Sequence, residues 1–339
     1  MKAIKVMEPF KVEIVEIDKP IIKNNDDVII KITSGGICGS DMGIWNGTNS
    51  LATYPRIIGH EFGGIVTEVG KNVKNIKIGD KVAVDPVVSC GHCYPCRIGR
   101  YNVCNTLEVM GVHRDGGFTE YVCVPEKNVH KFHIDYDESL LGIVEPYTIG
   151  MQINNRLQIT SDDTVLIMGS GPIGICAMQV AKTRGATVIM TDLVKERLDT
   201  AKDMGADYVL LSGRDDVEKS INEITKGEGV PVIIDTVCIP STFEASVKMA
   251  CAAGRIAVIG LKSQPSNIVM ADITKKELTI VGSRLNCNCF DEVIELFESK
   301  KVNPEKLKTM EFNYKDVEKS IKTIEERPQD VLKVVLKFD

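Results

Sequence analysis

Apolar and polar residues alternate in short runs over the first 34 residues, and again over residues 59–85 and 118–132. Alternation with a period of two places successive side chains on opposite faces of a β-strand. Glycine and proline separate the runs, which is typical of a β-rich, barrel-like module. The expected strands are Ala3–Val6, Val12–Ile17, Asp27–Ile32, Gly64–Gly70, Lys81–Asp85, Phe118–Val124 and Val129–Phe132.

The pattern changes after Pro146, where a predicted helix over residues 147–158 leads into alternating apolar runs and helical segments. Such alternation predicts a parallel sheet with crossover helices on both faces. The expected strands are Val165–Met168, Thr187–Thr191, Tyr208–Leu211, Val232–Asp235, Arg255–Ile259 and Leu278–Val281, and the expected helices are Pro172–Arg184, Lys195–Met204, Val217–Thr225 and Phe243–Ala250.

The C-terminal part changes pattern once more. Residues Asp291–Ser299 and Val317–Thr323 are expected to form helices, and Val331–Lys337 a final strand. No crossover helix follows this strand, so we expect it to return to the first, β-rich module.

Composition excludes several classes of function. The 339 residues are enough for two domains, and a net charge of -6 without a basic run argues against a nucleic-acid surface. No apolar run approaches the roughly 20 residues of a membrane span, and the N-terminus lacks the apolar core of a signal peptide. We therefore expect a cytoplasmic protein without a membrane or nucleic-acid partner. Disulfides are rare there, so clusters among the 11 cysteines point to metal.

A buried strand beginning at Thr164 runs into G-x-G-x-x-G and then a helix. Gly169 allows the tight turn, Gly171 lets the backbone approach a pyrophosphate, and Gly174 lets the helix pack closely on the strand. The N–H groups at the helix N-terminus then face the phosphates. The alternative is a tight turn in a ligand-free domain.

An acidic residue, Asp192, ends the next predicted strand. Its carboxylate is expected to accept hydrogen bonds from a ribose 2′-hydroxyl and to repel a 2′-phosphate, which favours NAD over NADP. Lys195 and Arg197 lie close by in the sequence and weaken that preference.

Four cysteines, Cys90, Cys93, Cys96 and Cys104, form the most specific pattern in the chain. Three at intervals of three with a fourth eight residues on can enclose one tetrahedral Zn²⁺ in a closed, structural four-thiolate site. An iron–sulfur cluster is the competing interpretation. His92 lies inside the lobe and is expected to be solvated, because four thiolates already complete the shell.

The stretch from residue 36 to 41 combines a soft metal ligand, Cys38, with the Ser40 hydroxyl and the Asp41 carboxylate. Glycines at positions 35, 36 and 39 are expected to let the backbone turn tightly around them. A lone cysteine in a glycine-rich stretch is ordinarily an inert packing residue.

Three residues elsewhere change that interpretation of Cys38. His60 and Glu61 offer an imidazole and a carboxylate in adjacent positions, and Glu145 is a carboxylate within an apolar run. Cys38, His60 and Glu145 can form a three-ligand zinc site with the open fourth position of catalytic zinc. Taken singly, His60 is better explained as a surface or core histidine and Glu145 as an acid at a helix N-terminus, but the nucleotide-binding motif and the four-cysteine lobe favour the catalytic interpretation.

Taken together, these motifs resemble the zinc-containing medium-chain dehydrogenases of the alcohol dehydrogenase superfamily over the whole chain. Within that family the chain is similar to the polyol branch of sorbitol, threonine and sugar-acid 5-dehydrogenases. Residues 84–96 and 111–118 resemble the bacterial starvation-sensing dehydrogenases and galactonate oxidoreductases. The resemblance implies an α/β fold: a GroES-like β-rich catalytic domain over residues 1–148 and 285–339, with a zinc lobe at 88–106, and a Rossmann doubly wound NAD-binding domain over 149–284.

The resemblance further implies that the protein transfers a hydride from a secondary alcohol of a polyol or sugar acid, such as galactonate or gulonate, to NAD. It implies two zinc ions per chain, one catalytic and one structural. Cys38 and His60 then bind the catalytic zinc, and Glu145 takes the place of the second cysteine of the alcohol dehydrogenases. Glu61 acts on the zinc directly or through water.

Other residues receive supporting roles from the same resemblance. Asp41 orients His60, and Ser40 takes the proton of the substrate hydroxyl. His113 and Arg284 are candidate contacts for a substrate carboxylate, and Arg114 is either a third such contact or a solvated surface charge. The expected cofactor contacts are Gly169, Gly171, Pro172, Ile173, Gly174, Asp192, Arg197, Val237, Ile259, Gly260 and Arg284.

One departure from the family pattern concerns proton release. Many relatives carry a histidine five residues after the catalytic cysteine as the last group of a proton relay, and this chain has Gly43 there. The remaining cysteines, including Cys287 and Cys289, are expected to pack or lie free.

Several alternatives stay open. L-Threonine 3-dehydrogenase and sorbitol or galactitol dehydrogenase share the same chemistry, whereas a non-catalytic NAD-sensing protein or a zinc-free quinone reductase would not. We expect a homodimer or homotetramer, with the strand near Leu278–Val281 as a candidate seam.

Overall fold

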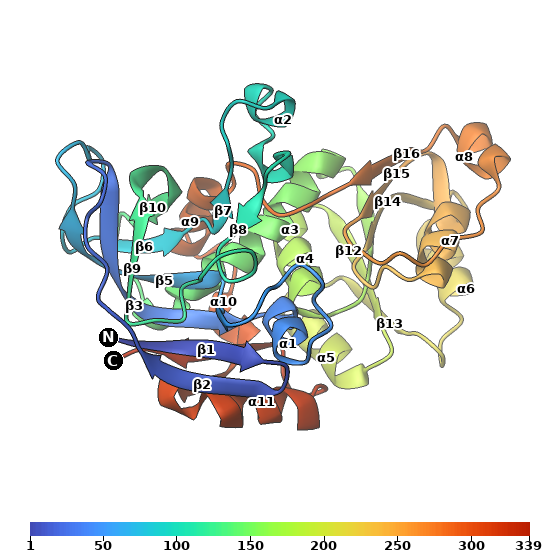
Figure 1. Ribbon diagram of the computed structural model, residues 1–339. Coiled ribbons are helices and arrows are strands. Elements are labelled where there is room, and N and C mark those ends of the chain that lie inside the picture. Colours follow the sequence, from blue (N-terminus) through green and yellow to red (C-terminus); the bar gives the residue numbers. More distant parts are fainter. The chain divides into compact units, whose positions relative to one another are not determined.

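The computed structural model describes residues 1–339, and the chain divides into two compact units (Figure 1). The first unit comprises Met1–Pro146 and Cys287–Asp339, and the second comprises Tyr147–Asn286. The first boundary falls inside helix α3 (Val144–Leu157). No helix is long and apolar enough to cross a membrane.

The first unit is built on a seven-stranded sheet in the order β10-β6-β5-β3-β18-β17, with β9 also paired to β3. Strand β18 runs antiparallel to β3, which confirms that the last strand returns to the first module. The strands are β3 (Asp27–Ile37), β5 (Glu61–Val69), β6 (Lys81–Val84), β9 (Tyr121–Pro125), β10 (Val129–Lys131), β17 (Lys308–Asn313) and β18 (Lys333–Lys337).

Two smaller sheets and five short helices complete this unit. The sheets are β2-β1-β4 and β7-β8. Their strands are β1 (Lys2–Glu8), β2 (Lys11–Glu16), β4 (Arg56–Ile57), β7 (Val87–Val88) and β8 (Glu108–Val109), and the helices are α1 (Gly39–Trp45), α2 (Tyr94–Arg97), α9 (Phe290–Glu298), α10 (Pro304–Leu307) and α11 (Val317–Glu326).

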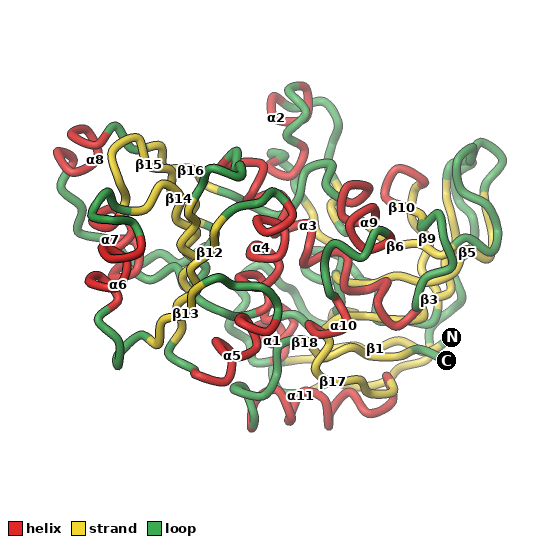
Figure 2. Tube along the Cα trace, turned by 180° about the vertical axis from the view of Figure 1, so that it is seen from behind, coloured by secondary structure: helices red, strands yellow, loops and turns green.

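The second unit contains a six-stranded, wholly parallel sheet in the order β13-β12-β11-β14-β15-β16. Figures 1 and 2 show α3 and α4 on one face and α6 and α7 on the other. The central strands are apolar and buried on both faces, as such a sandwiched sheet requires. The strands are β11 (Thr164–Met168), β12 (Thr187–Asp192), β13 (Tyr208–Leu211), β14 (Val230–Asp235), β15 (Ala250–Val258) and β16 (Thr279–Gly282), and the helices are α4 (Pro172–Thr183), α5 (Lys195–Asp203), α6 (Val217–Ile224), α7 (Pro240–Met249) and α8 (Met270–Lys276).

The prediction that glycines turn the backbone around Cys38 is wrong. Gly35 and Gly36 lie within β3, and Gly39 is the first residue of α1. A Cβ atom on Gly35 would lie 2.6 Å from a ring carbon of Phe118, and one on Gly36 would lie 2.2 Å from Oε2 of Glu61. Both glycines therefore serve the close approach of neighbouring side chains rather than a turn.

Candidate active site

Asp41 connects the backbone segments that carry Cys38 and His60. Its carboxylate is almost completely buried and accepts the Cys38 N–H at 2.9 Å and the Gly59 N–H at 3.1 Å. Gly59 has a positive φ of 95° and packs against the ring of Phe118, where no other residue fits. Asp41 therefore fixes both segments from the first turn of α1.

The His60 ring lies between Asp41 and Ser40. Its Nδ1 is 3.5 Å from an Asp41 carboxylate oxygen, an ion-pair separation without the alignment of a hydrogen bond. Its Nε2 is 3.3 Å from the Ser40 hydroxyl oxygen. Burial lowers the pKa of His60, but the charges of Asp41 and Cys38 outweigh burial and hold the pKa well above 6.5.

Glu61 follows His60 at the start of β5 and carries a buried, half-satisfied carboxylate. Its Oε1 accepts a hydrogen bond from Lys333 Nζ at 2.7 Å, whereas its buried Oε2 accepts none. The Lys333 ammonium also donates to the Ile37 carbonyl oxygen at 3.3 Å. An acceptor left without a donor inside a protein is costly, so Oε2 is suited to a cation.

The structure brings Cys38, His60 and Glu61 together, with one ligand atom of each within 4.8 Å of the others. Glu145 does not belong to this group of three. It is buried, and the charges of His60 and Glu61 both affect its pKa. Burial raises the pKa of Glu145 to about 8, against the opposing effect of His60. A thiol, an imidazole and a carboxylate are ligands that fit a divalent cation such as zinc, and the Lys333 ammonium pairs with the other oxygen of the Glu61 carboxylate.

Cys90, Cys93, Cys96 and Cys104 form a second group. The Sγ atoms of Cys93 lie 3.4 Å from Cys96 and 3.7 Å from Cys104, and Cys90 lies 4.0 Å from Cys96. Four sulfurs about 2.3 Å from a tetrahedral zinc would be about 3.8 Å apart, so these positions fit one zinc. The Cys90 N–H, among other donors, lowers the pKa of Cys104 to about 6. His92 is exposed, as expected.

The glycine turn after β11 has the geometry of a phosphate cradle. Gly169 adopts a φ of 100°, open only to glycine at low cost, and a Cβ on Gly174 would lie 2.0 Å from the Gly169 carbonyl oxygen. Gly171 faces open space at the N-terminus of α4. Asp192 lies beside this turn, where it accepts the Ser170 N–H at 2.7 Å.

The remaining predicted contacts are less specific. Arg284 is exposed two residues beyond β16, and His113 accepts the Val109 N–H at 3.1 Å through Nδ1. Arg114 is half-exposed and pairs with Glu108 at 3.4 Å. Cys287 and Cys289 belong to neither group of metal-ligating residues.

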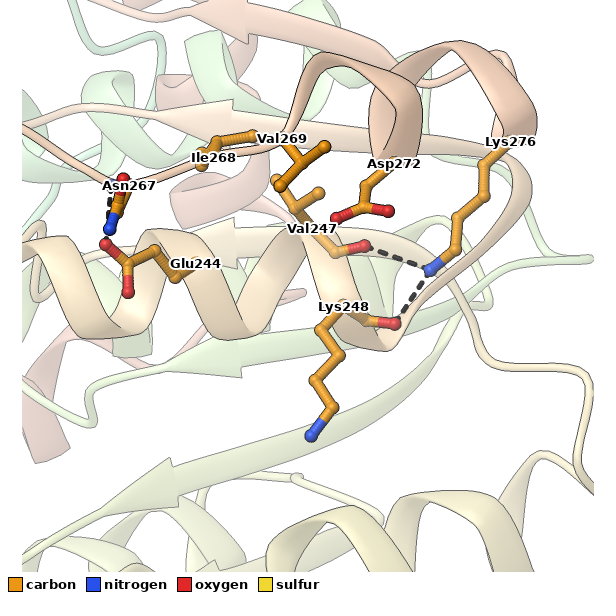
Figure 3. Close-up of a pocket in the computed structure, with 8 residues that line it drawn as sticks. All are labelled: Glu244, Val247, Lys248, Asn267, Ile268, Val269, Asp272 and Lys276. Atoms are coloured by element: carbon orange, nitrogen blue, oxygen red, sulfur yellow. Dashed lines mark hydrogen bonds between the residues drawn. The ribbon is translucent and has the colours of Figure 1, made fainter.

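A further cavity of about 310 Å³ lies between α7 and α8 in the second unit (Figure 3). The Lys276 ammonium donates to the carbonyl oxygens of Val247 at 3.0 Å and Lys248 at 2.7 Å, near the end of α7. Lys276 thus caps a helix, and none of the predicted site residues lines this cavity.

Sequence reasoning missed Lys333. The signal was present in the final strand, where Lys333 and Val335 lie on one face and Val334 and Leu336 on the other. Lys333 lies between the apolar residues Leu332 and Val334, so it is expected to be buried, and a buried ammonium needs a carboxylate. The partner, Glu61, is 272 positions away and cannot be identified from the sequence of the strand.

Comparison with known proteins finds a family match in each of the two parts of the chain. Residues 24–134 match the family described as alcohol dehydrogenase GroES-like domain, and residues 172–299 match the family described as zinc-binding dehydrogenase. The chain is 42% identical to the starvation-sensing protein RspB of Escherichia coli K12, covering 100% of this chain and 99% of RspB. It is 33% identical to the sorbitol dehydrogenase of Bacillus subtilis 168, covering 99% and 97% of the two chains.

A solved structure extends the comparison to three dimensions. The crystal structure of RspB from Escherichia coli CFT073, described as an alcohol dehydrogenase in complex with the cofactor NADH, superposes with a TM-score of 0.94 at 42% identity. The match covers 100% of this chain and 99% of that one. The predicted α/β class, with a GroES-like domain and a Rossmann sheet, is confirmed.

Proposed function

The chain belongs to the zinc-binding, GroES-like alcohol dehydrogenases, and from that premise we propose that it transfers a hydride from a secondary alcohol of a polyol or sugar acid to NAD. The observation that carries the proposal is that Cys38, His60 and Glu61 lie close together, and that the buried Oε2 atom of Glu61 receives no hydrogen bond. The RspB structure contains NADH, which supports NAD as the cofactor. The similarity of this chain to a sorbitol dehydrogenase supports a polyol as the class of substrate.

Cys38 and His60 would hold the catalytic zinc, with Glu61 or Glu145 completing the protein ligands. Zinc bound in such a site lowers the pKa of a hydroxyl group, which prepares an alcohol for loss of hydride. Asp41 keeps the thiol and the imidazole in place through the backbone N–H groups of Cys38 and Gly59.

Ser40 is suited to receive the proton that the alcohol loses. Its hydroxyl oxygen contacts His60 Nε2 at 3.3 Å, and a hydroxyl can accept one proton while it donates another. Lys333 neutralises Glu61 through Oε1 and leaves Oε2 for the cation. Each of these residues lies in the first unit.

Asp192 favours NAD over NADP in this proposal. The carboxylate already accepts the N–H groups of Ser170 and Val194, at 2.7 and 2.9 Å, which aligns it beside the glycine turn. A 2′-phosphate placed there would meet like charge. Steady-state rates with NAD and NADP test this assignment, and equal kcat/KM for the two cofactors would contradict it.

Arg284, and less directly His113, are candidates for binding the carboxylate of a sugar acid. If the substrate is an aldonate, Arg284→Ala raises KM for acids far more than for neutral polyols. Arg114→Ala is the control, because Arg114 already pairs with Glu108. Equal effects of Arg284→Ala on acids and polyols would contradict the carboxylate role.

A substrate panel distinguishes the proposal from its alternatives. Aldonates, hexitols and L-threonine are each supplied with NAD, and the absorbance of NADH is followed. Turnover of threonine alone would favour a threonine 3-dehydrogenase. One zinc per chain with no turnover of any alcohol would favour an NAD-sensing protein, and a zinc-free chain would favour a quinone reductase.

The proposal includes a homodimer or homotetramer. Strand β16 lies at the edge of its sheet, where its free backbone groups can pair with a second copy. Light scattering of the purified chain gives the mass directly, and a monomer would contradict this part of the proposal.

A further inference from the structure

Asp235 is a completely buried carboxylate that the proposed reaction does not use. It is the last residue of β14, and in register it pairs with Met168 of β11 on one side and Val258 of β15 on the other. Ligands of parallel α/β sheets bind beyond the carboxyl ends of the strands. Asp235 therefore lies at the carboxyl end of the sheet, where ligands bind, and is the last residue before the loop that follows β14.

The carboxylate organises the loop that follows β14. Its Oδ1 accepts the N–H groups of Val237 and Cys238, at 3.0 and 2.9 Å, and its Oδ2 accepts the Thr242 hydroxyl at 2.8 Å. These bonds hold Cys238 at a φ of 54°, which a non-glycine residue adopts at a cost. A buried carboxylate that accepts several hydrogen bonds holds the loop in one conformation.

The same loop packs on the phosphate cradle. Thr236 donates to the Met168 carbonyl oxygen from both its N–H, at 3.0 Å, and its hydroxyl, at 2.7 Å. A Cβ on Gly169 would lie 2.5 Å from the Thr236 hydroxyl oxygen and 3.2 Å from a methyl group of Val237. Any shift of the loop would therefore move residues that pack against Gly169, the first glycine of the cradle.

Cys238 joins this loop to the segment after β15. Its Sγ donates to the Asp235 carbonyl oxygen and accepts the Gly260 N–H, both at 3.0 Å. A Cβ on Gly260 would lie 2.3 Å from the Cys238 Cβ, so the two segments approach as closely as backbone allows. The thiol thus links two loops by hydrogen bonds at the carboxyl end of the sheet.

The strand order shows which half of a dinucleotide these loops face. Asp192 ends β12, on one side of β11, whereas Asp235 and Gly260 follow β14 and β15 on the other side. With the pyrophosphate at the glycine turn and the adenosine ribose at Asp192, the nicotinamide half extends toward β14 and β15. We propose that Asp235 and Cys238 are positioning residues that hold the loops after β14 and β15 in place for the nicotinamide half of NAD.

This inference rests on the proposed function, because it assumes that the chain binds NAD. It predicts that Cys238→Ala weakens NADH binding and leaves ADP binding unchanged, since ADP lacks the nicotinamide half. Losing the link to Gly260 is expected to raise the NADH dissociation constant about tenfold, the effect of one lost hydrogen bond. Cys238→Ser retains a donor and an acceptor and should recover part of the affinity.

The experiment measures the dissociation constants of NADH and ADP by titration calorimetry for the wild type, Cys238→Ala, Cys238→Ser and Asp235→Asn. Asp235→Asn keeps the shape of the side chain but replaces one acceptor by a donor toward Thr242, so it too should weaken NADH alone. Cys251→Ala is the matched control, because Cys251 lies near the opposite end of β15 and bonds only locally, to the Ala252 carbonyl oxygen.

Selective loss of NADH affinity in Cys238→Ala and Asp235→Asn, with recovery in Cys238→Ser, supports the inference. Unchanged NADH affinity in both variants overturns it, and so does an equal loss of NADH and ADP affinity. If the wild type binds NADH and the variants match it, only this inference fails. If the wild type binds neither ligand, the proposed function fails and the inference falls with it.

Discussion

Lys333 donates a hydrogen bond to Glu61 at 2.7 Å while their side chains are only 3% and 1% exposed. The pair joins the last strand of the chain to the residue that follows His60. Removing one partner leaves an uncompensated buried charge, which typically costs about 3–5 kcal/mol. Lys333→Met is therefore expected to destabilise the chain by about that amount in urea unfolding.

A double-mutant cycle separates this pair from general damage to the core. Glu61→Gln removes the charge that Lys333→Met leaves unpaired, so the double variant should lose less stability than the two single losses added together. Strictly additive losses would mean that the pair has no interaction energy of its own.

A side chain at Gly36 is expected to be destabilising, because a Cβ would overlap Oε2 of Glu61. Gly36→Ala should cost about 1–3 kcal/mol through overpacking and displace the carboxylate from the candidate zinc site. Gly39→Ala is the control three residues on, where nothing lies within 4 Å. Thermal unfolding and zinc content measure both effects, and equal behaviour of the two variants would contradict the packing role of Gly36.

Gly43 leaves the proton path without the histidine that many relatives carry. A Cβ there would lie 3.4 Å from the Thr48 hydroxyl oxygen and from the Asn49 Cβ, so a side chain fits after a small adjustment. We expect Gly43→His to raise the rate at neutral pH several-fold, because an imidazole can carry the proton to solvent. Gly43→Ala adds the Cβ alone, and a pH–rate profile identical in all three forms would refute the idea.

Asp207 predicts a pH dependence of stability in the second unit. Burial raises its pKa, but hydrogen bonds from Lys182 and from the Val188 N–H outweigh burial and lower the pKa below 3.8. A lowered folded pKa stabilises the fold above about pH 4, and that stability is lost as the pH falls through the folded pKa.

Asp207→Asn should therefore cost about 1 kcal/mol at pH 7, a value reduced by solvent because the carboxylate is one-third exposed. The difference from the wild type should shrink as the pH falls below about 4 and through the lowered folded pKa of Asp207. Urea midpoints at pH 7 and pH 3 measure it, and a difference independent of pH would show that the charge contributes nothing.

Motifs of local geometry were predictable from the sequence. Cys90, Cys93 and Cys96 lie on one short turn and helix, so their spacing alone indicates that their sulfurs converge. The glycine turn at Gly169 follows its strand directly and needs no distant partner. Helix α8 was not predictable, because Met270 and Val269 at its start are exposed and show no helical period.

Contacts between distant segments could not be predicted in the same way. The glycines of β3 looked like turn residues, because nothing near them in the sequence reveals that Phe118 and Glu61 need the space of their missing side chains. The link from Cys238 to Gly260 and the pair of Lys333 with Glu61 likewise depend on how strands are ordered in a sheet.

Zinc content tests the central claim most directly. The wild-type chain is expected to contain two zinc ions, one in the four-cysteine lobe and one at Cys38 and His60, and His60→Ala is expected to retain one and to produce no NADH from any alcohol. A wild-type chain with fewer than two zinc ions, or a His60→Ala variant that keeps both, would contradict the account.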